Sequence, residues 1–90
     1  MMEIEILSYG SVREIVGVKA IPWECADEAT VEDVITSLEA TFGDLEPDSE
    51  FGRTPLVIVK NGRNIALHEG RSTRLAAGDQ LILSGPPMPE

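Results

Sequence analysis

The sequence predicts an α+β domain in which one main helix packs across a mixed sheet of about five strands. Three observations predict this fold class. They are an alternation of acidic and apolar residues at the start of the chain, one stretch with helical periodicity, and two later short apolar runs. Apolar residues make up 42% of the 90-residue chain, which is enough for one compact core in a single domain.

The first third of the chain predicts two strands joined by a short irregular segment. Residues 3–9 begin with alternating acidic and apolar side chains, so they are expected to form a strand with one buried face. Residues 12–16, closed by Gly17, are expected to form a loop with one helical turn. A second strand is expected at about residues 18–24. Because Pro22 has no amide hydrogen, this strand should lie at an edge of the sheet or be bulged there.

The middle of the chain contains the predicted helix. Thr30 is a good N-cap residue, and Asp33, three positions later, nearly completes a capping box. The apolar residues that follow have the spacing of one helical stripe, and Gly43 suits the position just after the helix. The stripe consists of Val31, Val34, Ile35, Leu38 and Phe42. A helix of this kind must bury its stripe, and the predicted strands provide the surface.

The second half predicts a loop and three more strands. Residues 44–54 are polar and rich in turn formers, which indicates a surface loop. Residues 56–60 form a continuous apolar run, typical of a strand that is buried on both faces or packed under a helix. Asn61-Gly62 is a strong hairpin signal, so residues 63–67 are expected to be the return strand. The last strand is expected at residues 80–83.

The predicted order of elements defines a topology. With right-handed crossovers, the first and last strands pair in parallel at the centre of the sheet, and the helix lies across one face. This arrangement is the ubiquitin-like β-grasp, and we expect it to occupy residues 1–85. Residues 86–90 contain three prolines, so they are expected to form a flexible, extended tail.

Composition argues against several classes of function. The net charge of −9 should repel nucleic acid, and it either attracts a basic partner protein or mainly maintains solubility. A single cysteine, Cys25, and a single histidine, His68, give no basis for a disulfide or a metal site. Arg71 and Arg74 are read as solvated loop residues more than as a basic patch. The chain has no membrane-spanning apolar run and no signal-peptide pattern, so a cytoplasmic location is expected.

Three segments resemble a known family. Residues 4–17 are similar to its first strand and the Val-Arg-Glu-Leu-x-Gly segment that follows, residues 59–63 to its Val-Asn-Gly hairpin, and residues 75–81 to its Leu-x-x-Gly-Asp-Glu-Val segment. Their order and spacing agree with the family over the whole chain. The sequence therefore resembles the MoaD/ThiS sulfur carriers, ubiquitin-like proteins that include the small subunit of molybdopterin synthase and the small archaeal modifiers.

The resemblance implies a protein that binds other proteins and has neither a catalytic site nor a cofactor. The implied partner is an adenylating enzyme of the ubiquitin-activating type or a protein like the molybdopterin synthase large subunit. The implied role is sulfur transfer in molybdopterin or thiamine synthesis or in tRNA thiolation, or protein modification. No acid–base pair, nucleophile constellation or phosphate-binding loop in the sequence suggests an enzyme.

The end of the chain departs from the family pattern. Members end in Gly-Gly, which threads a narrow channel to the partner's active site, whereas Pro89 and Glu90 occupy those positions here and Gly85 is the last glycine. The family's carrier position therefore corresponds to Gly85, Pro89 or Glu90. The departure leaves an alternative open, in which the chain is a non-carrier β-grasp binding subunit or regulator of a larger enzyme complex that has lost the tail chemistry.

Four apolar residues are candidates for contact with a partner. Trp23 is one, because tryptophan is enriched at binding hot spots, although its position near a strand edge suits a core role equally well. The others are Leu81, Leu83 and Met88, since ubiquitin-like proteins usually meet partners through the exposed face of the sheet. A core role remains the default interpretation for the two leucines.

Overall fold

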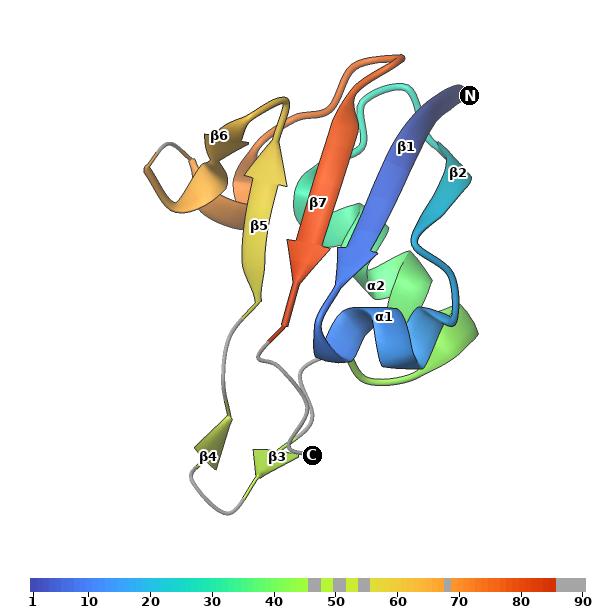
Figure 1. The fold of residues 1–90 in the computed structure, drawn as a ribbon. Helices are drawn as coiled ribbons and strands as arrows, with labels where there is room; N and C mark the ends of the chain where they lie inside the picture. The colour runs from blue at the N-terminus through green and yellow to red at the C-terminus, as the bar shows by residue number, and fades with distance from the viewer. Residues whose placement is uncertain (46–47, 50–51, 54–55, 68, 86–90) are drawn as a thin grey trace.

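The computed structural model describes residues 1–45, 48–49, 52–53, 56–67 and 69–85 (Figure 1). Its main sheet has five strands in the order β2-β1-β7-β5-β6. These are β1 (Met2–Tyr9), β2 (Ala20–Cys25), β5 (Val57–Lys60), β6 (Arg63–Asn64) and β7 (Gln80–Ser84). The helices are α1 (Ser11–Val16), α2 (Val31–Phe42) and two 3-10 helices, η1 (Ile65–Leu67) and η2 (Gly70–Ser72). A separate two-stranded pair is formed by β3 (Asp48–Ser49) and β4 (Gly52–Arg53).

The first and last strands of the described chain form the centre of the sheet. β1 and β7 pair in parallel, with Glu5 opposite Gln80 and Tyr9 opposite Ser84. β2 pairs antiparallel with β1, and β5 pairs antiparallel with β7. Helix α2 lies across one face of this sheet (Figure 1). The predicted mixed sheet, central parallel pair and single main helix are therefore confirmed.

The core lies between α2 and the sheet. The four residues of the predicted stripe from Val31 to Leu38 are 0% exposed, and Phe42 packs against them half-buried. From the sheet, Ile4 and Ile6 of β1 and the two leucines of β7 point toward α2 and are at most 2% exposed. Burial of apolar side chains of this size contributes about 1.5–3 kcal/mol each, so this layer is the main source of stability.

Helix α2 begins and ends where the sequence predicts. The Thr30 hydroxyl accepts a hydrogen bond from the Asp33 amide at 3.3 Å, and the Asp33 carboxylate accepts one from the Thr30 amide at 3.0 Å. This reciprocal pair is a complete capping box. At the other end Gly43 has φ 102°, a conformation that favours glycine, and the helix stops there.

Strand β2 lies at the edge of the sheet, as Pro22 predicts. The Lys19 carbonyl accepts a hydrogen bond from the Ser8 amide at 2.8 Å, and the register pairs Pro22 with Glu5. Because bonded and non-bonded pairs alternate in an antiparallel ladder, Pro22 falls at a non-bonded pair and faces the free edge. Its missing amide hydrogen therefore removes no bond to β1.

Of the two expectations for the second half, one holds and one was wrong in length. Strand β5 follows the second alternative predicted for it and packs under the helix with one buried face, since Ile58 is 3% exposed in the core while Val57 is 51% exposed. The return strand after the Asn61-Gly62 turn contains two residues instead of five. The return strand is short because the chain turns after Asn64. The Asn64 side-chain oxygen accepts a hydrogen bond of 2.9 Å from the Ala66 amide, and the chain continues as η1.

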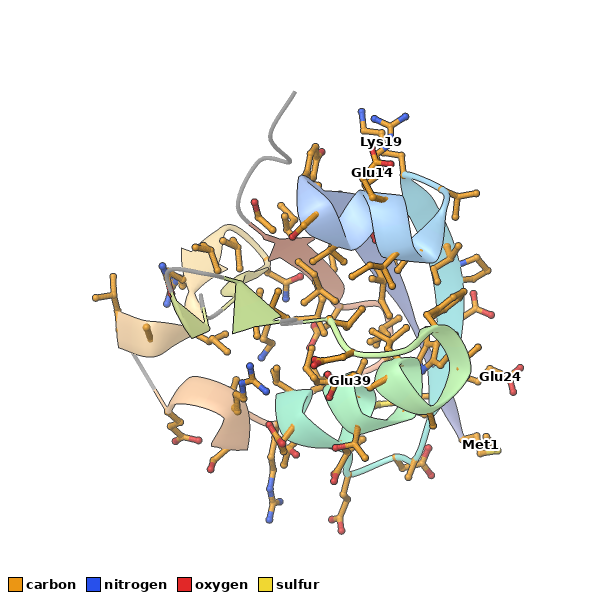
Figure 2. All side chains as sticks on the ribbon, turned by 90° about the horizontal axis from the view of Figure 1, so that it is seen from below. Met1, Glu14, Lys19, Glu24 and Glu39 are labelled. Atoms are coloured by element: carbon orange, nitrogen blue, oxygen red, sulfur yellow. The ribbon has the colours of Figure 1, made fainter. Side chains whose placement is uncertain are left out.

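The segment after α2 is more ordered than the predicted surface loop. Leu45 is 0% exposed, and its amide donates a hydrogen bond of 3.1 Å to the Glu39 carboxylate, which points toward this segment in Figure 2. Further on, β3 and β4 pair as a small antiparallel hairpin. Residues 46–47, 50–51 and 54–55 lie outside the described structure.

A buried carboxylate joins the turn before β7 to the β5–β6 turn. Asp79 accepts hydrogen bonds from the Ala76 amide at 2.7 Å and from the Asn61 side-chain amide at 2.9 Å, and Lys60 Nζ lies 3.6 Å from it. Burial alone would raise the pKa of Asp79. The hydrogen bonds from Ala76 and Asn61, together with the positive charge of Lys60, outweigh burial and hold the pKa below its ordinary value of 3.8.

The capping box gives the first testable prediction. Thr30→Ala removes the oxygen that accepts the Asp33 amide, so it should lower the free energy of unfolding by about 1 kcal/mol. Thr36→Ala, at an exposed position of the same helix, is the matched control and should leave stability unchanged or slightly raised. Urea unfolding followed by circular dichroism measures both. Equal stability of the two variants would contradict the capping role.

The lowered pKa of Asp79 predicts a pH dependence of stability. A depressed pKa in the folded state stabilises the fold above the unfolded pKa, and this contribution is lost as pH falls through the folded value. Asp79→Asn should therefore reduce the free energy of unfolding near neutral pH by roughly 1–2 kcal/mol, and the difference from wild type should shrink below about pH 4. Urea unfolding across a pH series measures this difference. A difference independent of pH would refute the assignment.

Candidate protein-binding face

The face of the sheet opposite α2 carries a continuous apolar row. Leu7 on β1 lies opposite Ile82 on β7, which in turn lies opposite Val59 on β5, and all three are half-buried. Ala20 on the edge strand β2 continues the row, opposite Leu7. We call these four residues the outer row. Their side chains point away from the core because successive residues of a strand alternate between its two faces.

Next to the outer row, along the strands, is the place where the described chain leaves the sheet. Ser84, the last residue of β7, lies between Tyr9 on β1 and Val57 on β5. Tyr9 and Val57 are exposed, at 38% and 51%, and Figure 1 shows the arrowheads of β1 and β7 side by side at this edge. Lys19 Nζ lies 5.8 Å from the centre of the Tyr9 ring, a cation–π contact.

The other end of the same face is acidic. Glu3 lies opposite Glu24, which projects outward from β2 in Figure 2. Glu5 accepts a 2.9 Å hydrogen bond from the Gln80 side-chain amide. The face therefore changes from apolar beside Ser84 to acidic at the start of β1. A surface of this kind is complementary to an apolar partner surface with basic residues at one margin.

Gly85 is held against the domain instead of being free. Its amide donates a hydrogen bond to the Tyr9 carbonyl at 3.3 Å, which extends the β1–β7 pairing by one residue. A Cβ atom at this position would collide with Ser11 Oγ and lie 3.2 Å from Ser11 Cβ and 3.4 Å from the Val12 backbone nitrogen. Close approach to α1 thus favours glycine here, and a hydrogen bond holds the chain to the domain up to this residue.

The expectation that Leu81 and Leu83 contact a partner was wrong in its geometry. Both are 0% exposed and pack in the core, because they have the parity of β7 that faces α2. Trp23 is half-buried on β2, packs against the core, and has its ring centre 6.2 Å from that of Phe42. Met88, Pro89 and Glu90 lie outside the described residues.

The outer row itself was missed at the sequence level. The run of three apolar residues from Leu81 to Leu83 does not show which face is buried. A signal was available in the flanking residues, since Gln80 and Ser84 are polar and share the parity of Ile82. Leu7 likewise shares the parity of Glu3 and Glu5 and so lies on their face of β1.

The described residues contain no group of three or more histidine, cysteine or acidic side chains that could hold a metal ion. Burial, and secondarily the negative charge of Asp27, raise the pKa of the Cys25 thiol, while the N-terminal amine lowers it to a smaller extent, so the reactive thiolate is disfavoured. His68 lies outside the described residues. In the described part of the chain, no helix is both long and apolar enough to cross a membrane.

Comparisons with known proteins agree with this architecture. A family model described as the ThiS family matches residues 6–83. Small archaeal modifier protein 3 of Haloferax volcanii is 38% identical over 89 residues, which cover 94% of this chain and 96% of that protein. The solution structure of the HVO 2177 protein of Haloferax volcanii has a TM-score of 0.80 at 35% identity, covering 99% of this chain and 87% of that chain.

A more distant likeness supports the fold. The crystal structure of small archaeal modifier protein 1 of Haloferax volcanii has a TM-score of 0.75 at 23% identity, covering 98% of this chain and 100% of that chain. At this level of identity the likeness is evidence for the fold alone. The ubiquitin-like β-grasp predicted from the sequence is confirmed.

The close packing of Gly85 predicts a specific coupling with Ser11. Gly85→Ala should lower the free energy of unfolding by on the order of 1 kcal/mol, because the added methyl group meets Ser11. Ser11→Ala removes Oγ, so Gly85→Ala should cost less in that background. A double-mutant cycle measured by urea unfolding gives the coupling. Additive effects of the two substitutions would show that Gly85 does not pack on Ser11 in solution.

Proposed function

Because the chain belongs to the ThiS family of ubiquitin-like proteins, we propose that it acts as a sulfur carrier or protein modifier that binds other proteins through its outer row. The observation that carries this proposal is the position of the row. Leu7, Ile82 and Val59 lie side by side on the three central strands. The row is next to the ends of β1 and β7, where Gly85 leaves the sheet. A partner seated on this face would be beside the start of residues 86–90.

The partner we propose is an adenylating enzyme of the ubiquitin-activating type or a protein like the molybdopterin synthase large subunit. Its contact surface would be apolar opposite Ile82 and basic opposite Glu3 and Glu24, in keeping with the net charge of −9. We expect no nucleic acid or membrane on this face, because its acidic end and the net charge of −9 would repel the phosphates of both. The pathway would be molybdopterin or thiamine synthesis, tRNA thiolation or protein modification, in the cytoplasm.

The chemistry would take place on the chain's C-terminal carboxylate, with every catalytic residue supplied by the partner. The carboxylate attacks the α-phosphate of ATP and releases pyrophosphate, giving an acyl adenylate. A sulfur donor then attacks the acyl carbon and displaces AMP, which leaves a thiocarboxylate; alternatively, a target lysine attacks and forms an amide. In this proposal residues 1–85 are the binding domain and residues 86–90 the reacting tail, where Met88 contacts the partner's channel.

The experiment measures two quantities, the binding of the chain to an activating enzyme and the intact mass of the chain. The purified chain is incubated with ATP, a sulfide donor and an activating enzyme of this family, and intact mass spectrometry follows replacement of one carboxylate oxygen by sulfur. Wild type should be captured by the enzyme and converted. Ile82→Glu and Val57→Glu should weaken capture at least tenfold, because each places a charge in an apolar contact.

Two controls make the outcome decisive. Leu67→Glu introduces the same charge at an 81% exposed leucine of η1, away from the outer row, and should leave capture unchanged. The double variant Pro89→Gly, Glu90→Gly tests the tail separately from the face. Equal capture of the Ile82, Val57 and Leu67 variants would refute the binding face. Capture of wild type and of the glycine variant without any mass gain would overturn the carrier role and favour a non-carrier binding subunit.

A further inference from the structure

Basic side chains are concentrated at one corner of this acidic domain. Residues 60–74 contain four of the chain's seven basic residues and one of its sixteen acidic residues. In the structure two of these basic residues, Lys60 and Arg63, line a hollow of about 450 Å³ beside the β5–β6 turn and the two 3-10 helices. The described residues lining it are Lys60, Asn61, Arg63, Ile65 and Thr73. None of them belongs to the outer row, so the hollow is a separate surface.

The cations at this corner differ in what holds them. Arg71 is paired with Glu32 at 3.2 Å, which ties η2 to α2. Lys60 donates a hydrogen bond to the Arg74 carbonyl at 3.1 Å and lies 3.6 Å from Asp79, so its ammonium group is fixed in place at the wall of the hollow. Arg63 is exposed, and within the described residues its guanidinium has neither an ion pair nor a hydrogen bond.

The other polar side chains that line the hollow are Asn61 and Thr73, and of these Asn61 has a hydrogen-bond donor left to offer. Asn61 donates one amide hydrogen to Asp79, and its second amide hydrogen has no acceptor among the described residues. The Thr73 hydroxyl donates to the Gly70 carbonyl at 2.6 Å, so toward the hollow it can only accept. Donors therefore come from β5, from the turn and from β6, with one guanidinium that no described carboxylate neutralises.

We propose that this hollow binds the phosphate group of a small phosphorylated molecule. A tetrahedral oxyanion accepts hydrogen bonds from several directions, which suits donors on Lys60, Asn61 and Arg63 that belong to three successive segments. A lone carboxylate would be satisfied by a single planar guanidinium. The volume of about 450 Å³ exceeds that of a phosphate ion, so the organic part of the ligand has room beside Ile65 and Thr73.

Pyrophosphate is the probe for the test, titrated into the ¹⁵N-labelled full chain at constant ionic strength. Saturable shifts are expected at the amides of residues 61–65 and of Thr73. Arg63→Gln should weaken binding about tenfold, because it removes a charge-assisted donor from an exposed position without a structural contact. Arg13→Gln, at an exposed arginine of α1, is the matched control and should bind pyrophosphate like wild type.

Each alternative outcome is informative. Shifts that do not saturate, or that are equal in the Arg63 and Arg13 variants, would overturn the proposal, because they would show only general charge attraction. Binding of a hexaglutamate peptide in place of pyrophosphate would also overturn it, since the hollow would then recognise carboxylates of an acidic polypeptide. None of these outcomes bears on the outer row, whose test uses different residues and a different readout.

Discussion

The parallel pairing of β1 with β7 is the constraint on which the rest of the structure depends. It joins segments from opposite ends of the chain, and the hydrogen bond between Gln80 and Glu5 spans 75 positions of sequence. Closing so long a loop has an entropic cost, which hydrogen bonds alone do not offset. The compensation is the apolar layer beneath the pair, where Ile6 and Leu81 lie opposite each other and are 0% exposed under α2.

The same pairing also determines the surface. Since residues of a strand alternate between faces, a register that buries Ile6 and Leu81 must expose Leu7 and Ile82. A slip by one residue would exchange the two sets and leave α2 facing glutamates. The core and the outer row are therefore two consequences of one register, and the register that forms the core also determines which side chains the outer face exposes. The same register also positions Gly85. The parallel pairing ends at Tyr9, whose carbonyl accepts the Gly85 amide hydrogen, and this places Gly85 against α1.

Sequence reasoning succeeded where the determinants are local. The capping box of Thr30, the stripe of α2, the edge position of Pro22 and the Asn61-Gly62 turn depend on residues within a few positions of one another. It failed where an uninterrupted apolar run hides the direction of the side chains, as in β7. It predicted the pairing of the first and last strands, but it did not anticipate individual side-chain contacts between distant segments. The packing of Gly85 on Ser11 is set by tertiary structure and leaves no sequence pattern.

The basic corner is informative because folding explains only part of it. In a chain with a net charge of −9, cations are most useful to stability when they pair with carboxylates, as Arg71 does with Glu32 and Lys60 with Asp79. Arg63 forms no such pair within the described residues, although acidic residues outnumber basic ones more than twofold. Its guanidinium lines a hollow, where an anion would complete the charge balance. Arg13 is likewise exposed and without an ion pair among the described residues, so what distinguishes Arg63 is its place at the hollow, beside the ammonium group of Lys60 and the side-chain amide of Asn61.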